Sequence, residues 1–585
     1  MRHWIVGAGC AAMLVLAGLP AMAADAGADA RFKAIYTREW AWRELQYPGD
    51  DDDDRKELPD HLAKVDAATQ AMRLAYWQDV MRQLNAIEPA SLSRGAQIDY
   101  AVYKPQIQTF ITQEHFHDYE MPANSDSAFW SDITEFSRRK LKSAEEYRHY
   151  IALLNDIPRY FGELTADMRA GLARGFTPPK VTMTGRDKSI AVIGDAHGVN
   201  NVFYTPFKKM PDTIPAADQA AMRAQALAAI EKSIVPAYGK LLKFVRDEYI
   251  PKSRTTLAAE SLPDGKAYYR SQIEEYTTTD MDPAAIHALG LSEMAMIHAH
   301  MLDVMKQTGF KGDFPAFLHY LRTDPKFYAK TPDELLKDAA WIAKRFDGVS
   351  AQYFGYLPRQ RFAIKPVPPD IAPFYTSGRG GPGVYLVNTY NLPARPLYNL
   401  TALTLHESAP GHAFQMPIAL EHKDLPEFRR KNYISAYGEG WALYCEKLGV
   451  EMGMYDTPYD LFGMWTYQAW RAGRLVVDTG IHSQGWTREQ AQKYLHDNTA
   501  LTDHEIETEV DRYIGWPAQA LSYYLGASDI WKNRARAEKA LGPKFNIRAY
   551  HDAVLELGSV PLPLIDQRID RFIAEGGKGP YPDME

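Results

Sequence analysis

Long amphipathic stretches run through much of this chain and restrict it to a largely helical fold. Between residues 32 and 365, apolar positions recur at helical spacing, and only short turns rich in proline, glycine and aspartate interrupt them. Residues 216–249 form one such helix, which Pro236 is expected to kink or divide because proline lacks a backbone donor. Another helix is expected to begin at Pro283, directly after the capping residue Asp282. No unit of about 20–50 residues repeats, so a solenoid is excluded.

The helical pattern gives way to breakers and one strand near Pro366. Residues 377–383 are rich in glycine and are expected to break regular structure. Residues 383–389 then alternate and carry β-branched and aromatic side chains, which is typical of a strand. Helix resumes from Leu400. The expected organisation is a mainly α, two-lobed fold with a small β-sheet, divided into a signal peptide (1–23), an N-terminal helical region (24–368) and a catalytic region (369–585), the last two forming one domain.

The first residues have the features of a secretory signal peptide. A basic start is followed by an apolar run from Ile5 to Leu19 and by the cleavage pattern Ala21-Met22-Ala23. The run is shorter than the roughly 20 apolar residues of a membrane span, and no later segment resembles one. Cys10 would suit a lipoprotein signal, but the three residues before it match a lipobox poorly. We therefore expect an exported, periplasmic protein with no membrane span in the mature chain.

Charge and cysteine content exclude several classes of protein. The 585 residues carry a formal net charge of −8, and the basic surface that nucleic acid requires is missing. Asp50–Asp54 is expected to be a solvated loop rather than a calcium site. Without the signal peptide, Cys445 is the only cysteine, so no internal disulfide can form. It could be a nucleophile, but a small buried apolar residue is the expectation. The oligomeric state is left open.

Two histidines that flank a glutamate form the clearest candidate for a metal-binding motif in this chain. His406-Glu407 is followed by His412, and Pro410-Gly411 lies between them. Zinc in hydrolases takes imidazole and carboxylate ligands and leaves one position for water, and a neighbouring carboxylate can accept a proton from that water. On an unbroken helix, residues six apart lie about 120° from facing the same side. Because proline and glycine permit an opening, we expect the chain to loop out two residues and to bring the two metal-facing nitrogens about 3–3.5 Å apart.

A third ligand is expected from the segment that begins at Glu439. Trp441, Tyr444 and Leu448 form an apolar stripe at helical spacing, and Glu439 and Glu446 lie on the opposite face. The two glutamates are separated by about 10 Å along the helix axis, so only one can bind the ion. We assign Glu439 as the third ligand.

Four ordered motifs resemble the bacterial family named domain of unknown function 885. They are HESAPGH (406–412), EGWALY (439–444), VVDTGIH (476–482) and RYIGWPAQALSYYLG (512–526). The second also resembles the segment that carries the third zinc ligand in the aminopeptidase N group of gluzincins. The resemblance covers most of the mature chain and implies the fold of helical zinc peptidases of the thimet oligopeptidase and angiotensin-converting-enzyme type. The spacing H-E-x-x-P-G-H departs from their H-E-x-x-H, and Tyr524 stands where the family often has lysine.

Further residues are candidates for the remainder of such a site. Tyr513 and Tyr523 could donate a hydrogen bond to an oxyanion, as phenols do in related peptidases, and Arg512 could pair with a substrate carboxylate. Asp478 or His482 could hold a ligating histidine by its second nitrogen. The segment Val384–Asn388 could be an edge strand on which a peptide pairs, with Asn388 contacting it. For each residue, structural packing is an equal alternative. The histidine pairs His115/His117 and His298/His300 are expected to be surface or packing residues.

The sequence thus predicts a zinc-dependent metallopeptidase that cleaves short or unfolded peptides. Glu407 would be the general base, with Tyr523 as a further catalytic residue, and His406, His412 and Glu439 would hold zinc. Two alternatives remain. The chain could be a metal-free peptide-binding or scaffold protein, or a zinc hydrolase of a non-peptide amide or ester.

Overall fold

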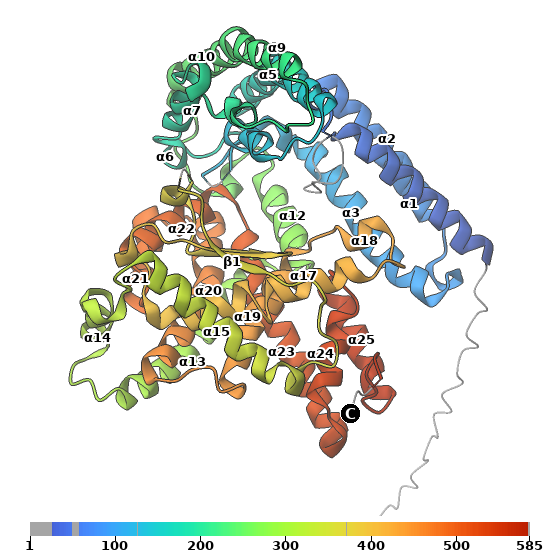
Figure 1. The fold of residues 1–585 in the computed structure, drawn as a ribbon. Helices are drawn as coiled ribbons and strands as arrows, with labels where there is room; N and C mark the ends of the chain where they lie inside the picture. The colour runs from blue at the N-terminus through green and yellow to red at the C-terminus, as the bar shows by residue number, and fades with distance from the viewer. Residues whose placement is uncertain (1–25, 49–57, 126, 370, 583–585) are drawn as a thin grey trace, which may run out of the picture.

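The computed structural model describes residues 26–48, 58–125, 127–369 and 371–582. The predicted signal peptide and the five-aspartate run Asp50–Asp54 lie outside the described residues. The described part is mainly helical, as predicted, and Figure 1 shows two lobes, with α5, α7, α9 and α10 in the upper one. Among the described residues, no helix combines the length and the apolar character that a membrane span needs.

The upper lobe has a hydrophobic core of its own, built from residues between Leu58 and Tyr249. In chain order, the helices up to Lys252 are α1 (Ala26–Gln46), α2 (Ala67–Asn85), α3 (Arg94–Phe116), α4 (Phe129–Asp132), α5 (Ala144–Arg174), α6 (Lys180–Met183), α7 (Asp187–Gly194), α8 (Thr205–Lys208), α9 (Ala216–Ala229), α10 (Val235–Phe244) and α11 (Ile250–Lys252). Of these, α1, α2 and α3 contribute to a different core, which they share with the lower lobe. The predicted helix over 216–249 is confirmed, with two π-helical turns at Ile230–Ile234 and Val245–Tyr249. The first turn directly precedes Pro236, where it accommodates the missing backbone donor.

The lower lobe contains the remaining helices. They are α12 (Gly265–Thr277), α13 (Pro283–Gln307), α14 (Phe314–Thr323), α15 (Pro332–Tyr353), α16 (Leu400–Glu407), α17 (His412–Glu421), α18 (Glu427–Arg430), α19 (Ser435–Glu451), α20 (Pro458–Gln484), α21 (Arg488–Asn498), α22 (Asp503–Gly515), α23 (Ser522–Leu541), α24 (Ile547–Leu555) and α25 (Leu562–Ala574). The predicted start at Pro283 is confirmed, because the Asp282 side chain accepts a hydrogen bond from the backbone of Ala284. Helix α20 runs through the middle of this lobe, and nearly all of its residues from Phe462 onward are buried.

One hydrophobic core cluster combines both ends of the chain. Its members run from Ala28 in α1 to Phe572 in α25, and they include residues of α15, α16 and α19. The two regions predicted on either side of residue 368 therefore share this core. Their division stays a prediction.

The small sheet has three strands in the order β1-β3-β2, with β1 (Ala363–Pro366) parallel and β2 (Gly378–Gly381) antiparallel to β3 (Val384–Val387). The strand predicted over 383–389 is confirmed as β3. Its predicted position at an edge is wrong, because β3 pairs on both sides and lies in the centre. The glycine segment predicted only as a breaker forms β2. Cross-strand hydrogen bonds, which need only the backbone, overcome the low strand propensity of glycine there.

Candidate metal centre

The helix that carries the histidine motif is interrupted where the sequence places proline and glycine. Helix α16 ends at Glu407 and α17 begins at His412. The backbone N–H of Gly411 reaches back to donate to the carbonyl of Leu405 at 3.0 Å. A Cβ at position 411 would lie 1.8 Å from the carbonyl oxygen of His406, so only glycine allows this return of the chain. The detour turns His412 toward His406, and their ring centroids lie 4.9 Å apart.

Three side chains offer ligand atoms to one point. His406 Nε2 lies 3.4 Å and His412 Nε2 lies 3.3 Å from Glu439 Oε2. The three ligand atoms all lie within 4.8 Å of one another, and no other group of this kind occurs in the described part of the chain. Tetrahedral zinc with bonds of about 2.0–2.1 Å separates its ligands by about 3.3–3.4 Å. The donor set and its spacing therefore fit zinc. The two histidine nitrogens lie no more than 4.8 Å apart. Their predicted separation of about 3–3.5 Å stays a prediction.

Glu446, and not Asp478 or His482, holds the second nitrogen of His406. Its Oε1 accepts a hydrogen bond from His406 Nδ1 at 2.8 Å, and the glutamate is fully buried. Glu446 lies about two helical turns beyond Glu439 on the same face of α19. One imidazole therefore spans both carboxylates. The sequence already carried this signal, since it placed the two glutamates on one face of a helix.

The two residues predicted for this role lie elsewhere and connect helices. Asp478 accepts hydrogen bonds from the Tyr269 hydroxyl at 2.6 Å and from the backbone of Ala518. His482 accepts a hydrogen bond from the Ala259 backbone through Nδ1 and contacts the Tyr513 carbonyl through Nε2 at 2.9 Å. A supporting role at the candidate metal site is therefore not supported for either residue, because their hydrogen bonds go to other partners and not to His406 or His412.

The electrostatics of the site favour a bound cation. Burial opposes a charge on His406, but hydrogen bonds to Glu439 and Glu446 outweigh it and raise the pKa of His406 to about 10. Burial works against the ionised form of Glu439 as well, yet the neighbouring His412 and His406 lower its pKa well below the ordinary value. Without a metal, His406 therefore holds a proton. A divalent ion would take the place of this proton on the imidazole.

Glu407 is positioned by the edge strand of the sheet. Its Oε2 accepts a hydrogen bond from the Gly380 backbone at 2.6 Å. A Cβ on Gly380 would lie 1.7 Å from the carbonyl oxygen of Glu407, so β2 can approach α16 only with glycine here. Sequence reasoning missed Gly380, because a glycine-rich segment gives no sign of what its backbone will contact.

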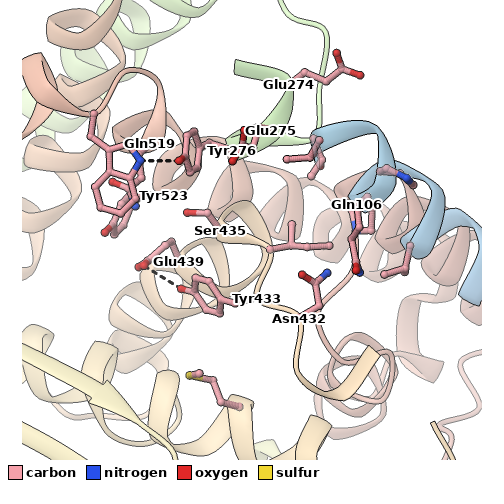
Figure 2. A pocket seen from close by; sticks show the side chains of 18 of the residues that line it. Gln106, Glu274, Glu275, Tyr276, Asn432, Tyr433, Ser435, Glu439, Gln519 and Tyr523 are labelled. Atoms are coloured by element: carbon pink, nitrogen blue, oxygen red, sulfur yellow. Dashed lines mark hydrogen bonds between the residues drawn. The ribbon is translucent and has the colours of Figure 1, made fainter. Parts of the chain in front are cut away.

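The three candidate ligands and Glu407 line a cavity of about 890 Å³. Its wall is assembled from segments far apart in the sequence, from α1 to α25, and Figure 2 shows some of the side chains that line it. The Tyr433 hydroxyl donates to Glu439 Oε1 at 2.9 Å, as Figure 2 shows, and Tyr433 was not found from the sequence. Tyr523 also lines the cavity, with its ring nearly parallel to His406 at a centroid distance of 6.2 Å. Two phenols thus lie close to the three ligands.

Of the predicted substrate-binding residues, only Arg512 lines this cavity. Its guanidinium donates to the Gln519 side chain at 2.9 Å. Asn388 is fully buried, and its amide donates to three backbone carbonyls of the chain before β2. Tyr513 is also buried, and its hydroxyl accepts from Trp470 and Arg474. Neither is a cavity-lining residue, so contact of Asn388 or Tyr513 with a substrate is not supported.

The other histidines and the cysteine have the packing roles expected of them. His298 packs against Phe314 and His300 stacks on Trp465 at 4.4 Å. His117 is hydrogen bonded to Glu120. Cys445 is fully buried within α19.

Comparisons with known proteins place the chain in a family without assigning it a function. The family model described as "Bacterial protein of unknown function (DUF885)" matches residues 46–569. No protein of curated description matches the sequence. A Colwellia psychrerythraea structure, provisionally described as a lipoprotein, is similar with a TM-score of 0.85 and 24% identity over 94% of this chain and 99% of that one. A Shewanella oneidensis structure, provisionally described as a lipoprotein of unknown function, has a TM-score of 0.66 and 16% identity over 93% and 99%. These likenesses show the fold alone, whereas the family match covers most of the sequence, and the chain therefore belongs to the bacterial DUF885 family.

Proposed function

We propose that this protein is a zinc-dependent metallopeptidase. The observation that carries the proposal is the gathering of three ligand atoms within 4.8 Å, next to Glu407 in one cavity. His406, His412 and Glu439 would hold the ion. Bound zinc lowers the pKa of a water molecule and polarises a carbonyl group.

The residues around these ligands have the roles that amide hydrolysis needs. Glu407, oriented by the Gly380 N–H, would accept the proton of the attacking water. Glu446 fixes the tautomer of His406, which leaves Nε2 free as a ligand. Tyr523 would donate a hydrogen bond to the developing oxyanion, because it lines the cavity and its ring lies beside His406. Tyr433 would hold Glu439 in place.

A peptide is favoured as substrate by the strand on the cavity wall. Gly378, Arg379 and Gly380 of β2 line the cavity, and β2 is an edge strand of the sheet. An extended peptide can add to such an edge through backbone hydrogen bonds. We therefore propose that a peptide pairs with β2 and not with β3, for which the sequence predicted this pairing. A cavity of about 890 Å³ that is lined by α1, α3 and the lower lobe suits short or unfolded chains and not folded proteins.

The resemblance of the motifs to gluzincin peptidases supports the same proposal. Although the second histidine follows at a different spacing, the break between α16 and α17 compensates for it. The two solved structures of similar fold are provisionally described as lipoproteins, which fits an exported, periplasmic location. The peptide substrate is the only partner that we propose.

Metal content is the first test of this function. We expect about one zinc per chain in protein purified without added metal, and a strong loss of zinc in His412→Ala. His319→Ala is a matched control, because His319 is an exposed histidine of α14 far from the ligands in sequence. Wild-type protein without zinc would favour a metal-free peptide-binding protein, and unchanged zinc content in His412→Ala would remove His412 as a ligand.

Hydrolysis is the second test. Turnover of peptides and of esters with matched side chains is measured for the wild-type protein and for Glu407→Gln. This variant should keep zinc but lacks the proton acceptor. We expect peptide turnover to fall by about 10²–10⁴-fold in this variant. Turnover of esters alone would favour a hydrolase of non-peptide substrates. Unchanged turnover in Glu407→Gln would remove Glu407 as the base.

A further inference from the structure

The wall of the cavity next to the metal ligands is strongly cationic. The charged side chains that α20 and α22 contribute to it are three arginines and one glutamate, namely Arg471, Arg474, Arg512 and Glu509. Arg471 and Arg474 lie one helical turn apart on α20 and are 3% and 1% exposed. Burying a guanidinium is costly unless it is paired with an acceptor. The partners of these two arginines therefore decide what this wall can bind.

The contacts of Arg471 and Arg474 leave several donors without an acceptor. Arg474 donates to Glu509 at 2.8 Å and to the Tyr513 hydroxyl at 2.9 Å, but its Nη1 has no partner in the described structure. Arg471 makes no hydrogen bond there through Nε or Nη1. Its nearest carboxylate oxygen is Glu446 Oε1 at 3.6 Å, which already accepts from His406. Buried donors without acceptors are rare in native proteins, and a ligand that brings acceptor oxygens from the cavity would satisfy them.

Aromatic rings fix the two guanidinium groups in place. The Arg471 guanidinium carbon lies 3.8 Å from the centroid of the Trp470 ring, and that of Arg474 lies 4.2 Å from the Tyr523 ring. Arg471 is also 5.8 Å from Tyr523. Stacked arginines lose little further freedom on binding, which suits two-pronged recognition of a planar carboxylate.

Tyr523 relates this cationic wall to the metal ligands. The same ring that contacts Arg474 lies 6.2 Å from the ring of His406. The width of one side chain thus separates the arginines from the ligands. A peptide advances by about 3.3–3.6 Å per residue, so a carboxylate held here would lie within one or two residues of a bond at the metal.

We propose that Arg471 and Arg474 bind the C-terminal carboxylate of the substrate, which makes the protein a peptidase that cleaves near the C-terminus. This inference rests on the proposed peptidase function and adds the class of its substrates. Arg512, on the same wall, would contribute further positive charge. An acidic side chain is the other source of the same carboxylate chemistry.

Binding of uncleaved peptides tests this proposal separately from catalysis. Calorimetry with Glu407→Gln compares an N-acetylated Ala-Ala-Phe-Ala peptide with its C-terminal amide and with an amide that carries an internal glutamate. We expect the free acid to bind about tenfold or more tightly than either amide. Equal affinities would overturn the proposal. Tight binding of the glutamate-containing amide would overturn it too, since the site would then read a side chain.

Variants of the two arginines test whether the preference for the free acid over the amide depends on them. Arg471→Gln and Arg474→Gln, each combined with Glu407→Gln, should reduce the acid-to-amide ratio to about one. Lys431→Gln is the control, because Lys431 is an exposed cation that lines the same cavity but belongs to neither α20 nor α22, and it should keep the ratio. A ratio lost in the control as well would argue for general charge attraction and against this site. If the buried arginine variants do not fold, the comparison of acid and amide in Glu407→Gln still decides. The binding measurement does not depend on hydrolysis. It therefore tests carboxylate binding even if the protein proves to have no peptidase activity.

Discussion

His406 lies between two carboxylates of the same helix, and this arrangement sets the chemistry of the site. Its Nε2 faces Glu439 and its Nδ1 is hydrogen bonded to Glu446. A histidine held at one nitrogen by a buried carboxylate is a stronger ligand at the other and has only one tautomer available. The fitness of the site for zinc therefore depends on Glu446 as well as on the three ligands.

Replacing Glu446 tests this dependence at the scale of one residue. Glu446→Ala leaves His406 Nδ1 without its acceptor, and we expect the Kd for zinc to rise by about 10–100-fold. Competition with a chelator of known affinity measures the Kd. Glu451→Ala is the control, because Glu451 belongs to the same helix but pairs with Arg534 at the surface. An equal Kd in both variants would show that Glu446 only packs.

The approach of β2 to α16 shows what a whole element contributes. Glu407 receives its hydrogen bond from the backbone of the strand, so the position of the strand orients the base. The close contact exists because position 380 has no side chain. A strand that seemed only a glycine-rich loop thereby connects the sheet to the metal-binding helix.

Adjacent glycines of β2 allow a matched test of this element. Gly380→Ala would place a Cβ against the backbone of Glu407, and we expect a loss of about 1–3 kcal/mol in unfolding free energy together with reduced peptide turnover. Gly381→Ala meets nothing within 4 Å and should change neither quantity by much. Urea unfolding and initial rates measure the two effects. Similar behaviour of both variants would mean that the strand moves freely relative to α16.

Across the whole molecule, buried polar groups join helices that are distant in sequence. His551 of α24 is fully buried, where it donates through Nδ1 to the carbonyl of Tyr353 at 2.8 Å and accepts from the Tyr444 hydroxyl at 2.7 Å. It thereby connects α24 with α15 and α19. Burial lowers the pKa of His551 to about 3. This histidine is neutral in the folded protein at any moderate pH.

The low pKa of His551 predicts how acid destabilises the fold. Below the ordinary pKa of about 6.5, the unfolded chain binds a proton on this histidine and the folded chain does not. Its contribution to stability is therefore present above about pH 6.5 and falls by about 1.4 kcal/mol per pH unit toward pH 3. His551→Gln lacks this titration, so the difference in unfolding free energy between wild type and variant should shrink as the pH falls. Urea unfolding between pH 7 and pH 5 measures it, and a constant difference would contradict the assignment.

Local patterns in the sequence determined the elements and pointed to the candidate metal ligands. Helical periodicity, the Asp282 cap and the alternation before residue 389 depend on neighbours in the chain, and the structure has the corresponding helices and β3. His406, His412 and Glu439 were identifiable because the break at Pro410-Gly411 is itself a local feature. Local interactions need no knowledge of the fold.

Only the tertiary structure decided which side chains support the site. Asp478, His482, Tyr513 and Asn388 have the right chemistry, but they are hydrogen bonded to other elements and do not line the cavity. Glu446, Gly380 and the cationic wall act through contacts between helices and a strand that are distant in sequence. The register and rotation of packed elements set such contacts, and those depend on the volumes of the whole core and not on any one motif.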